Sequence, residues 1–162
     1  MNTLYVITGG NLGDRRKNLL EAKNFIEERI GNIVRSSSIY ETEAWGSQGQ
    51  PSYFNQVHQL STSLKPKEII SAILKIEKDM GRIRTTKNAS RIIDIDILFY
   101  NDEIIAKENL VIPHKEITNR RFVLMPLNEI APDLVHPVLK KSIQELLTET
   151  GDSLKVTLLS TF

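Results

Sequence analysis

The chain has 162 residues, which suits one compact domain with a full apolar core, and we expect a single domain over residues 1–162. Its formal net charge of +1 gives no bulk field that would favour nucleic acid or a membrane surface as a partner. The absence of cysteine excludes a disulfide framework, thiolate zinc sites and a cysteine nucleophile, and it is compatible with a reducing cytoplasm. We read no signal peptide and no segment of transmembrane length, so we expect a soluble cytoplasmic protein.

The first thirty residues predict a strand, a turn and a helix. Residues 4–8 form a short apolar run that ends in Gly9-Gly10, as expected for a buried strand followed by a turn. Asp14 is a suitable N-cap for a helix over residues 15–30, and Gly31 suits the position after its end. The apolar stripe of this helix consists of Leu19, Ala22, Ile26 and Ile30.

The next seventy residues or so repeat this order of elements. Their composition predicts strands over residues 33–44, 53–64 and 92–100, with a loop over residues 45–52. Pro66 suits the first turn of a second helix. The apolar stripe of that helix consists of Ile69, Ile73, Ile76 and Met80, and Gly81 follows it. The order strand–helix–strand, strand–helix–strand is that of the ferredoxin-like βαββαβ plan, so we expect the α+β class with helices packed on an antiparallel sheet.

The last third of the chain is less regular and is expected to form a C-terminal extension of this core. Its predicted elements are a hairpin turn at Asn101-Asp102, a strand over residues 110–112, helices over residues 122–130 and 142–148, and a strand over residues 156–159. Pro126 falls inside the first of these helices, where it must begin or kink an element. No linker is long enough to indicate a second domain.

Two aspartates two residues apart give the strongest chemical signal. Asp94 and Asp96 share one face of the expected strand, because successive side chains on a strand point to opposite faces. The other face carries Ile93, Ile95 and Ile97. An exposed edge kept soluble by charge is the alternative, but aspartate is depleted in strands and this pair stands among strongly β-forming residues. Carboxylates spaced in this way are suited to hold one or two Mg²⁺ ions.

Basic side chains accompany this pair. Several lie on the connection before it, which could close over a triphosphate and supply positive charge. They are Arg82, Arg84, Lys87 and Arg91. A second polar cluster follows at His114, Arg120 and Arg121, whereas His58 and His136 are interpreted as structural. For both clusters, ordinary solvated surface is the alternative.

Tyr53 and Asn55 share one face of the third predicted strand. An aromatic ring beside an amide suits a flat heterocycle with ring nitrogens, and cross-strand packing is the alternative. Further segments match, in order and spacing, the motifs of one enzyme family. They are residues 9–14, 38–42, 50–55, 81–84, 87–98, 112–114, 119–122 and 126–132. On these segments, and over nearly its whole length, the chain resembles the 6-hydroxymethyl-7,8-dihydropterin pyrophosphokinases of folate biosynthesis.

The resemblance implies an ATP-dependent diphosphotransferase that moves the terminal two phosphates of ATP to the hydroxymethyl group of the pterin. The products would be AMP and the pterin diphosphate, in a step of tetrahydrofolate biosynthesis. Two Mg²⁺ ions would be bound by Asp94 and Asp96. Arg82 and Arg91 would complete the catalytic residues with these two acids. The partners would be the two small substrates, with no nucleic acid and no membrane, and we expect a monomer.

The same resemblance assigns substrate contacts. The pterin ring would lie between Tyr53 and Phe122, with Asn55 on its edge. Its remaining contacts would come from Thr42, Glu43, Ala44 and Trp45. ATP would be bound by Glu77, Arg84, Arg91, Ile97, His114, Lys115 and Arg120.

The chain departs from the family pattern at several positions. Asn88 stands where many members carry a tryptophan that closes over the pterin, and Asn109 stands where some carry an arginine. Gly10 replaces the usual serine, and residues 43–45 replace a more proline-rich segment. These departures concern loop closure and turnover rather than the metal site.

Two other function classes fit the ferredoxin-like plan. Two-metal nucleotidyl transferases share the paired carboxylates, but they leave Tyr53, Asn55 and Phe122 unexplained. An RNA-binding module would carry exposed aromatic side chains with basic residues beside them on its sheet. The fourth predicted strand presents aspartates instead, which repel phosphate unless a metal intervenes.

Overall fold

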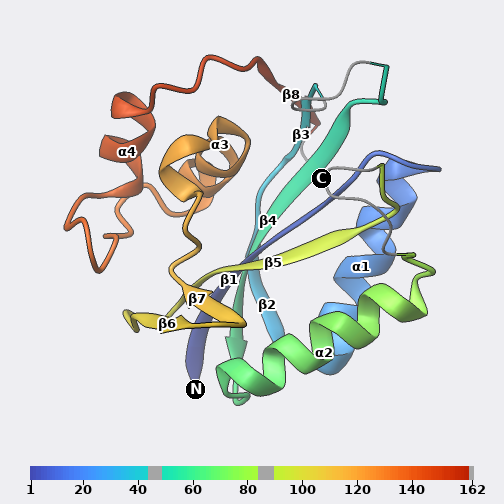
Figure 1. Cartoon of the computed structure of the whole chain (residues 1–162), viewed down its shortest axis with the longest axis horizontal. Helices are drawn as coiled ribbons and strands as arrows, with labels where there is room; N and C mark the ends of the chain where they lie inside the picture. Colours follow the sequence, from blue (N-terminus) through green and yellow to red (C-terminus); the bar gives the residue numbers. More distant parts are fainter. Residues whose placement is uncertain (44–48, 84–89, 161–162) are drawn as a thin grey trace.

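An antiparallel sheet forms the centre of the molecule in the computed structural model, which describes residues 1–43, 49–83 and 90–160 (Figure 1). Its strands are β1 (Asn2–Gly10), β2 (Asn32–Ser36), β3 (Ile39–Thr42), β4 (Tyr53–Thr62), β5 (Asp94–Tyr100) and β8 (Val156–Ser160). The strand order is β5-β1-β4-β3-β8, and β2 pairs with β4 beside β3. Strand β1 is therefore central, with β4 and β5 as its antiparallel neighbours.

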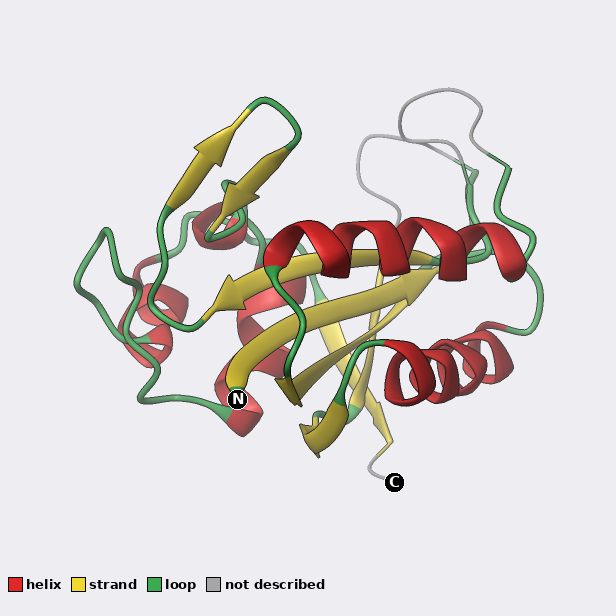
Figure 2. Cartoon of the chain, turned by 90° about the horizontal axis from the view of Figure 1, so that it is seen from below, coloured by secondary structure: helices red, strands yellow, loops and turns green. Residues whose placement is uncertain are grey.

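Helices cover both faces of this sheet. Helices α1 (Arg15–Arg29) and α2 (Pro66–Asp79) lie on one face, and α3 (Arg121–Ile130) and α4 (Ile143–Glu149) lie on the other (Figure 1). Each pair of helices packs on its own apolar cluster. A separate hairpin of β6 (Ile105–Lys107) and β7 (Leu110–Ile112) projects from the rest of the molecule (Figure 2). A short 3-10 turn, η1 (Ile117–Asn119), precedes α3. The expected α+β class is confirmed.

The side-chain alternation predicted for β5 is present. Ile95 and Ile97 are 3% and 5% exposed and belong to the cluster that packs on α1 and α2. Asp94 and Asp96 point to the opposite face, which is the face covered by α3 and α4. Burial of the isoleucines fixes the register, because a shift of one residue would exchange the two sets of side chains. The apolar pattern thus places both carboxylates on the same side of the sheet.

The single strand predicted over residues 33–44 is wrong, because it is interrupted at Ser37 and Ser38. The hydroxyl of Ser37 accepts a hydrogen bond from the backbone N of Val57 at 2.9 Å. The backbone N of Ser38 donates to Oε1 of Glu129 at 3.0 Å. The backbone N of Ser37 still donates to the carbonyl oxygen of Val57, but the backbone N–H groups of Val57 and Ser38 bond to side chains, so the chain forms β2 and β3 with a break between them.

The turn predicted at Gly9-Gly10 is also wrong, because β1 continues through both glycines. Gly9 pairs with Asn55 of β4 and with Asp94 of β5, and Gly10 pairs with Phe54. A Cβ atom on Gly9 would lie 2.0 Å from Nδ2 of Asn55. Position 9 therefore needs glycine because β4 approaches the backbone closely, and not because the chain turns there.

Replacing Gly10 by alanine is expected to destabilise the protein by about 1–3 kcal/mol. The added Cβ would lie 2.1 Å from the carbonyl oxygen of Ile92, so one of the two backbones must shift. Urea unfolding of the variant measures this loss. Gly151→Ala is the matched control, since a Cβ there meets nothing within 4 Å and stability should stay within about 0.5 kcal/mol. Equal stability of the two variants would contradict this account of the close approach.

The remaining predictions for the C-terminal third hold with small changes. Helix α3 begins at Arg121 and contains Pro126, and α4 is capped by the hydroxyl of Ser142, which accepts from the backbone N of Glu145. Strand β8 pairs with β3. The turn at Asn101 is present, but the strand after it was not predicted, and it pairs with β7 instead of β5. None of the described helices has both the length and the apolar character needed to cross a membrane.

Candidate active site

A cavity of about 410 Å³ lies between the central strands and the segment that leads into α3. The strands supply Thr8, Thr42, Tyr53, Asn55, Asp94 and Asp96, among others. The opposite wall is built from His114, Glu116, Asn119, Arg120 and Phe122, with Asp152 beside them. The cavity therefore brings together most of the residues that the sequence singled out, although they are far apart along the chain.

Asp96 has the most strongly altered titration in this cavity. Burial, the negative charge of Asp94 and a hydrogen bond to Asp94 raise the pKa of Asp96 to about 7. Two carboxylates on one face of a strand disfavour each other's ionisation unless positive charge is supplied. A cation bound at this pair would favour ionisation of Asp96.

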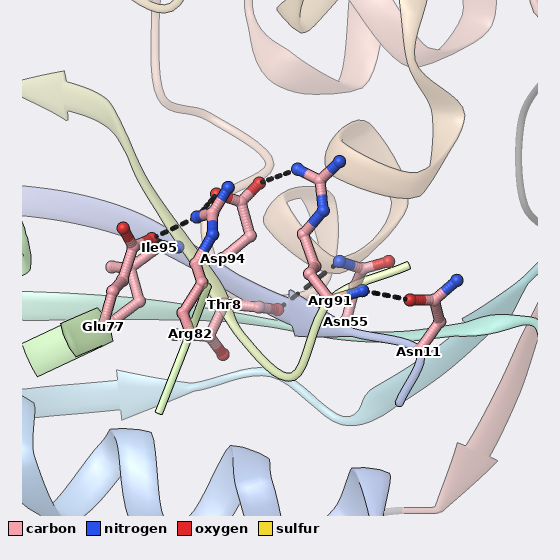
Figure 3. Close-up of polar contacts among 8 residues, drawn as sticks. All are labelled: Thr8, Asn11, Asn55, Glu77, Arg82, Arg91, Asp94 and Ile95. Atoms are coloured by element: carbon pink, nitrogen blue, oxygen red, sulfur yellow. Dashed lines mark hydrogen bonds and ion pairs between the residues drawn. The ribbon is translucent and has the colours of Figure 1, made fainter. Parts of the chain in front are cut away.

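Asp94 already contacts positive charge. Nη1 of Arg82 donates to its Oδ1 at 2.8 Å, and Nη1 of Arg91 lies 3.6 Å from its Oδ2 (Figure 3). The same nitrogen of Arg82 donates to Oε2 of Glu77 at 2.8 Å. Burial alone would lower the pKa of Arg82, but the charges of Asp94 and Glu77 raise it, so Arg82 stays protonated. Arg82 and Arg91 therefore both lie beside Asp94, Arg91 lines the cavity and Arg82 does not, and their catalytic role stays a prediction.

Glu77 lies behind this pair rather than in the cavity. Its side chain is 4% exposed, and its Oε2 also accepts from the backbone N of Ile95 at 2.9 Å. It holds Arg82 and the first residues of β5 together (Figure 3). The described contacts make Glu77 a support for the acidic site, and its direct contact with ATP stays a prediction.

A second group of basic side chains faces the acidic pair from the α3 side. Arg120 and His114 both line the cavity. Burial and the nearby charge of Arg120 lower the pKa of His114, so its ring is neutral at pH 7. Its Nδ1 accepts from the backbone N of Glu116 at 3.1 Å, which assigns the proton of the neutral ring to Nε2. His114 is therefore available as a neutral hydrogen-bond donor.

Aromatic and neutral polar side chains also line the cavity. Tyr53 and Phe122 both line it, and the guanidinium carbon of Arg120 lies 5.5 Å from the centre of the Phe122 ring. Asn55 donates from Nδ2 to the carbonyl oxygen of Thr8 at 3.4 Å. Within the described residues, the buried atoms Oδ1 of Asn55 and Oγ1 of Thr42 have no hydrogen-bond partner. Buried polar atoms without partners are costly, so these two are suited to bind a polar ligand.

The remaining predicted contacts include residues outside the described part of the chain. Ala44, Trp45 and Arg84 fall outside the described residues, as do Lys87 and Asn88. The side chain of Ile97 is in the apolar cluster on the opposite face of the sheet, and Lys115 is exposed and does not line the cavity. Glu43 lines the cavity, and its contact with the pterin stays a prediction.

The sequence did not single out Gln50, Glu116, Asn119 and Asp152, which also line the cavity. Gln50 and Asn119 belong to the matched segments, so the motifs themselves were a signal for these two residues. Asp152 accepts from the backbone N of Arg121 at 2.8 Å and thereby holds the start of α3. No local pattern predicts that contact, because it joins residues 31 positions apart.

Comparison with known proteins gives consistent matches. The family sequence model described as 7,8-dihydro-6-hydroxymethylpterin-pyrophosphokinase (HPPK) matches residues 5–132. The chain is 40% identical over 149 residues to the 2-amino-4-hydroxy-6-hydroxymethyldihydropteridine pyrophosphokinase of Aquifex aeolicus, covering 92% of each chain. It is 39% identical over 153 residues to the Haemophilus influenzae protein of the same name, covering 94% of this chain and 95% of that one.

A solved structure shows the same fold. It is that of Plasmodium falciparum HPPK-DHPS with SDX-DHP, which superposes with a TM-score of 0.76 at 20% identity. The match covers 92% of this chain and 43% of that one. Together with the full-length sequence relatives, these matches show that the chain belongs to the 7,8-dihydro-6-hydroxymethylpterin-pyrophosphokinase family of enzymes.

Proposed function

We propose that the protein catalyses the magnesium-dependent transfer of pyrophosphate from ATP to 6-hydroxymethyl-7,8-dihydropterin, giving AMP and the pterin diphosphate. Membership of a pyrophosphokinase family supports this reaction class. The observation that carries the proposal is a single cavity lined both by the pair Asp94 and Asp96 and by Tyr53, Asn55 and Phe122. A polyphosphate and a flat heterocycle could therefore meet in one site.

The acidic pair fits magnesium bound together with a nucleotide. Among the described residues, no group of three or more His, Cys, Asp or Glu side chains forms a complete metal cage. Mg²⁺ in nucleotide sites is commonly held by one or two carboxylates and completed by phosphate oxygens and water. Asp94 and Asp96 would hold two such ions, which would supply charge neutralisation to the phosphates when bound. Burial and the charge of Asp94 raise the pKa of Asp96, and a bound cation would offset both causes.

The basic residues on both sides of the pair would position the triphosphate. Arg82 and Arg91 approach Asp94 from one side, and Arg120 and the neutral donor His114 lie on the α3 side. Phosphoryl transfer requires little covalent chemistry from the protein and depends on positioning and electrostatic stabilisation. These side chains would neutralise the charge that develops on the transferring group and on the departing AMP.

The pterin would bind between Tyr53 and Phe122, with Thr42 and Asn55 on its polar edge. The unpartnered Oδ1 of Asn55 would accept from a ring N–H, and Oγ1 of Thr42 would bond a second polar atom. In the reaction, the hydroxymethyl oxygen forms a bond to the β-phosphorus of ATP, and the bond from that phosphorus to the oxygen shared with the α-phosphate breaks. AMP leaves with the electron pair, and the hydroxyl proton is released.

An assay that separates AMP from pyrophosphate tests this proposal. With ATP and Mg²⁺, AMP should form only when the pterin is added, in a one-to-one ratio with the pterin diphosphate. Removal of divalent cations with EDTA should stop the reaction, and added Mg²⁺ should restore it. Release of free pyrophosphate would instead support a nucleotidyl transferase.

We further propose that the protein acts in the cytoplasm as a monomer. Sedimentation of the pure protein tests the oligomeric state.

A further inference from the structure

The first residue after β1, Asn11, lies where the segments that lead into β4 and β5 meet. Gly10 pairs with Phe54 of β4, and Gly9 pairs with Asp94 of β5. The Asn11 residue is 1% exposed and does not line the cavity. The proposed reaction assigns it no role, yet it is a buried polar side chain next to the site.

Both ends of the Asn11 amide are engaged. Its Oδ1 accepts from the backbone N of Arg91 at 2.8 Å (Figure 3). Its Nδ2 donates to the carbonyl oxygen of Pro51 at 3.1 Å and to Oγ of Ser90 at 3.3 Å. The backbone N of Asn11 donates in turn to the carbonyl oxygen of Arg91 at 2.9 Å. Asn11 thus holds the backbone of Arg91 at both its N–H and its C=O group.

These partners require an amide at this position. A backbone N–H can only donate and a carbonyl oxygen can only accept, so Arg91 and Pro51 fix the orientation of the Asn11 amide. Aspartate, which has the same shape, would keep the acceptor for Arg91 but would face the Pro51 carbonyl with a second acceptor. Alanine would remove all three side-chain bonds.

The segment held in this way carries a side chain of the site. Arg91 lines the cavity, and its guanidinium lies 3.6 Å from Asp94. We propose that Asn11 is a positioning residue, which holds Arg91 so that its guanidinium meets the reacting phosphates. This inference rests on the proposed function, because it takes phosphates as the partners of Arg91. A misplacement of about 1 Å at such a group can lower the rate about 100-fold, so one buried amide can have a large effect on turnover.

A double-mutant cycle with Arg91 tests the inference. Asn11→Ala should lower kcat about 10–100-fold at saturating substrates, whereas Asn11→Asp, which keeps the acceptor for Arg91 but opposes the Pro51 carbonyl, should lower kcat less than Asn11→Ala does. In an Arg91→Ala background, Asn11→Ala should lower kcat no more than about threefold, because the group that it positions is already gone. Asn18→Asp is the matched control, since Asn18 lies in the same region and its side chain donates to the carbonyl oxygen of Leu12.

Hydrogen exchange gives a reading that does not depend on activity. In Asn11→Ala the backbone N–H of Arg91 loses its acceptor, so its proton should exchange faster with solvent. Asn11→Asp keeps that acceptor, so the proton should stay protected. If Asn11→Ala fails to fold, Asn11→Ser takes its place in the experiment. The serine hydroxyl is one bond too short to make the contacts of the Asn11 amide.

Two results would overturn the inference: an equal kcat loss from Asn11→Ala with and without Arg91, or unchanged kcat and unchanged exchange in Asn11→Ala. Failure of the wild type to release AMP in a magnesium-dependent way would count against the proposed function instead. The two failures are therefore separable.

Discussion

Replacing Asp96 by asparagine should lower kcat at least about 1,000-fold and yet make the protein more stable at pH 8. The loss of turnover corresponds to about 4 kcal/mol of transition-state stabilisation, and it follows if Asp96 is one of two carboxylates that hold the metal ions. The gain in stability follows from the pKa of Asp96, which burial and Asp94 raise from 3.8 to about 7. Above pH 7 the folded state therefore carries an unfavourable charge that the unfolded state carries without penalty.

The difference in unfolding free energy between Asp96→Asn and the wild type should depend on pH. A group whose pKa is raised in the folded state stabilises the fold below its unfolded pKa, here 3.8, and this contribution is lost as pH rises through 7. Asp96→Asn should thus be more stable than the wild type by about 1–3 kcal/mol at pH 8, with the difference shrinking toward pH 4. Urea unfolding at both pH values measures it.

Asp102→Asn is the control for this substitution, because Asp102 lies in an exposed turn away from the cavity. Its kcat and stability should match those of the wild type. An Asp96→Asn variant that kept kcat within tenfold of the wild type, or that was less stable than the wild type at pH 8, would show that Asp96 is a structural residue instead of a metal ligand.

The second large expected effect is acid sensitivity caused by His58. This residue is fully buried in β4, with Oγ of Ser36 2.7 Å from its Nδ1 and, among the described residues, no partner at Nε2. Burial, with a smaller effect from Lys23, lowers the pKa of His58 from 6.5 to about 3. The neutral ring suits the fold, so the stability it contributes is present above pH 6.5 and is lost as pH falls toward 3. At pH 5 the loss is about 2 kcal/mol.

Between pH 4 and 6.5, the titration of His58 lowers the stability of the fold as pH falls, whereas the titration of Asp96 raises it. The two contributions therefore partly cancel in the wild type. The experiment therefore uses Asp96→Asn as the background, where the opposing titration is absent. In that background, the unfolding free energy should fall by about 2 kcal/mol between pH 7.5 and pH 5, and adding His58→Gln should remove most of this fall. The same pH dependence with and without His58 would contradict the assignment.

Much of the fold follows from the sequence because its signals are local. The apolar stripes of α1 and α2 repeat with the helical period, and Ile95 and Ile97 alternate with the aspartates on β5. Each pattern needs only a few neighbouring residues to be recognised. The break at Ser37 and Ser38 could not be predicted in this way, because it depends on Val57 and on Glu129, which lies 91 positions from Ser38.

The site shows the same division. Asp94 and Asp96 could be recognised from their spacing, and the motifs placed Tyr53, Asn55 and Phe122 with them in one cavity. The resemblance pointed to Glu77 as an ATP contact and to the matched segment 9–14, which contains Asn11, but the supporting contacts of these two residues could not be recognised. Glu77 and Asn11 act through backbone groups of Ile95 and Arg91, respectively. Such contacts depend on which strands are neighbours in the sheet, and no local pattern contains that information.

A crystal structure with Mg²⁺, a non-hydrolysable ATP analogue and the pterin is the most direct test of the account. We predict Mg²⁺ ions about 2.1 Å from carboxylate oxygens of both Asp94 and Asp96, with phosphate oxygens completing their coordination. A structure in which both substrates are bound, the two carboxylates touch no metal and Asp94 is still held by Arg82 and Arg91 would contradict it.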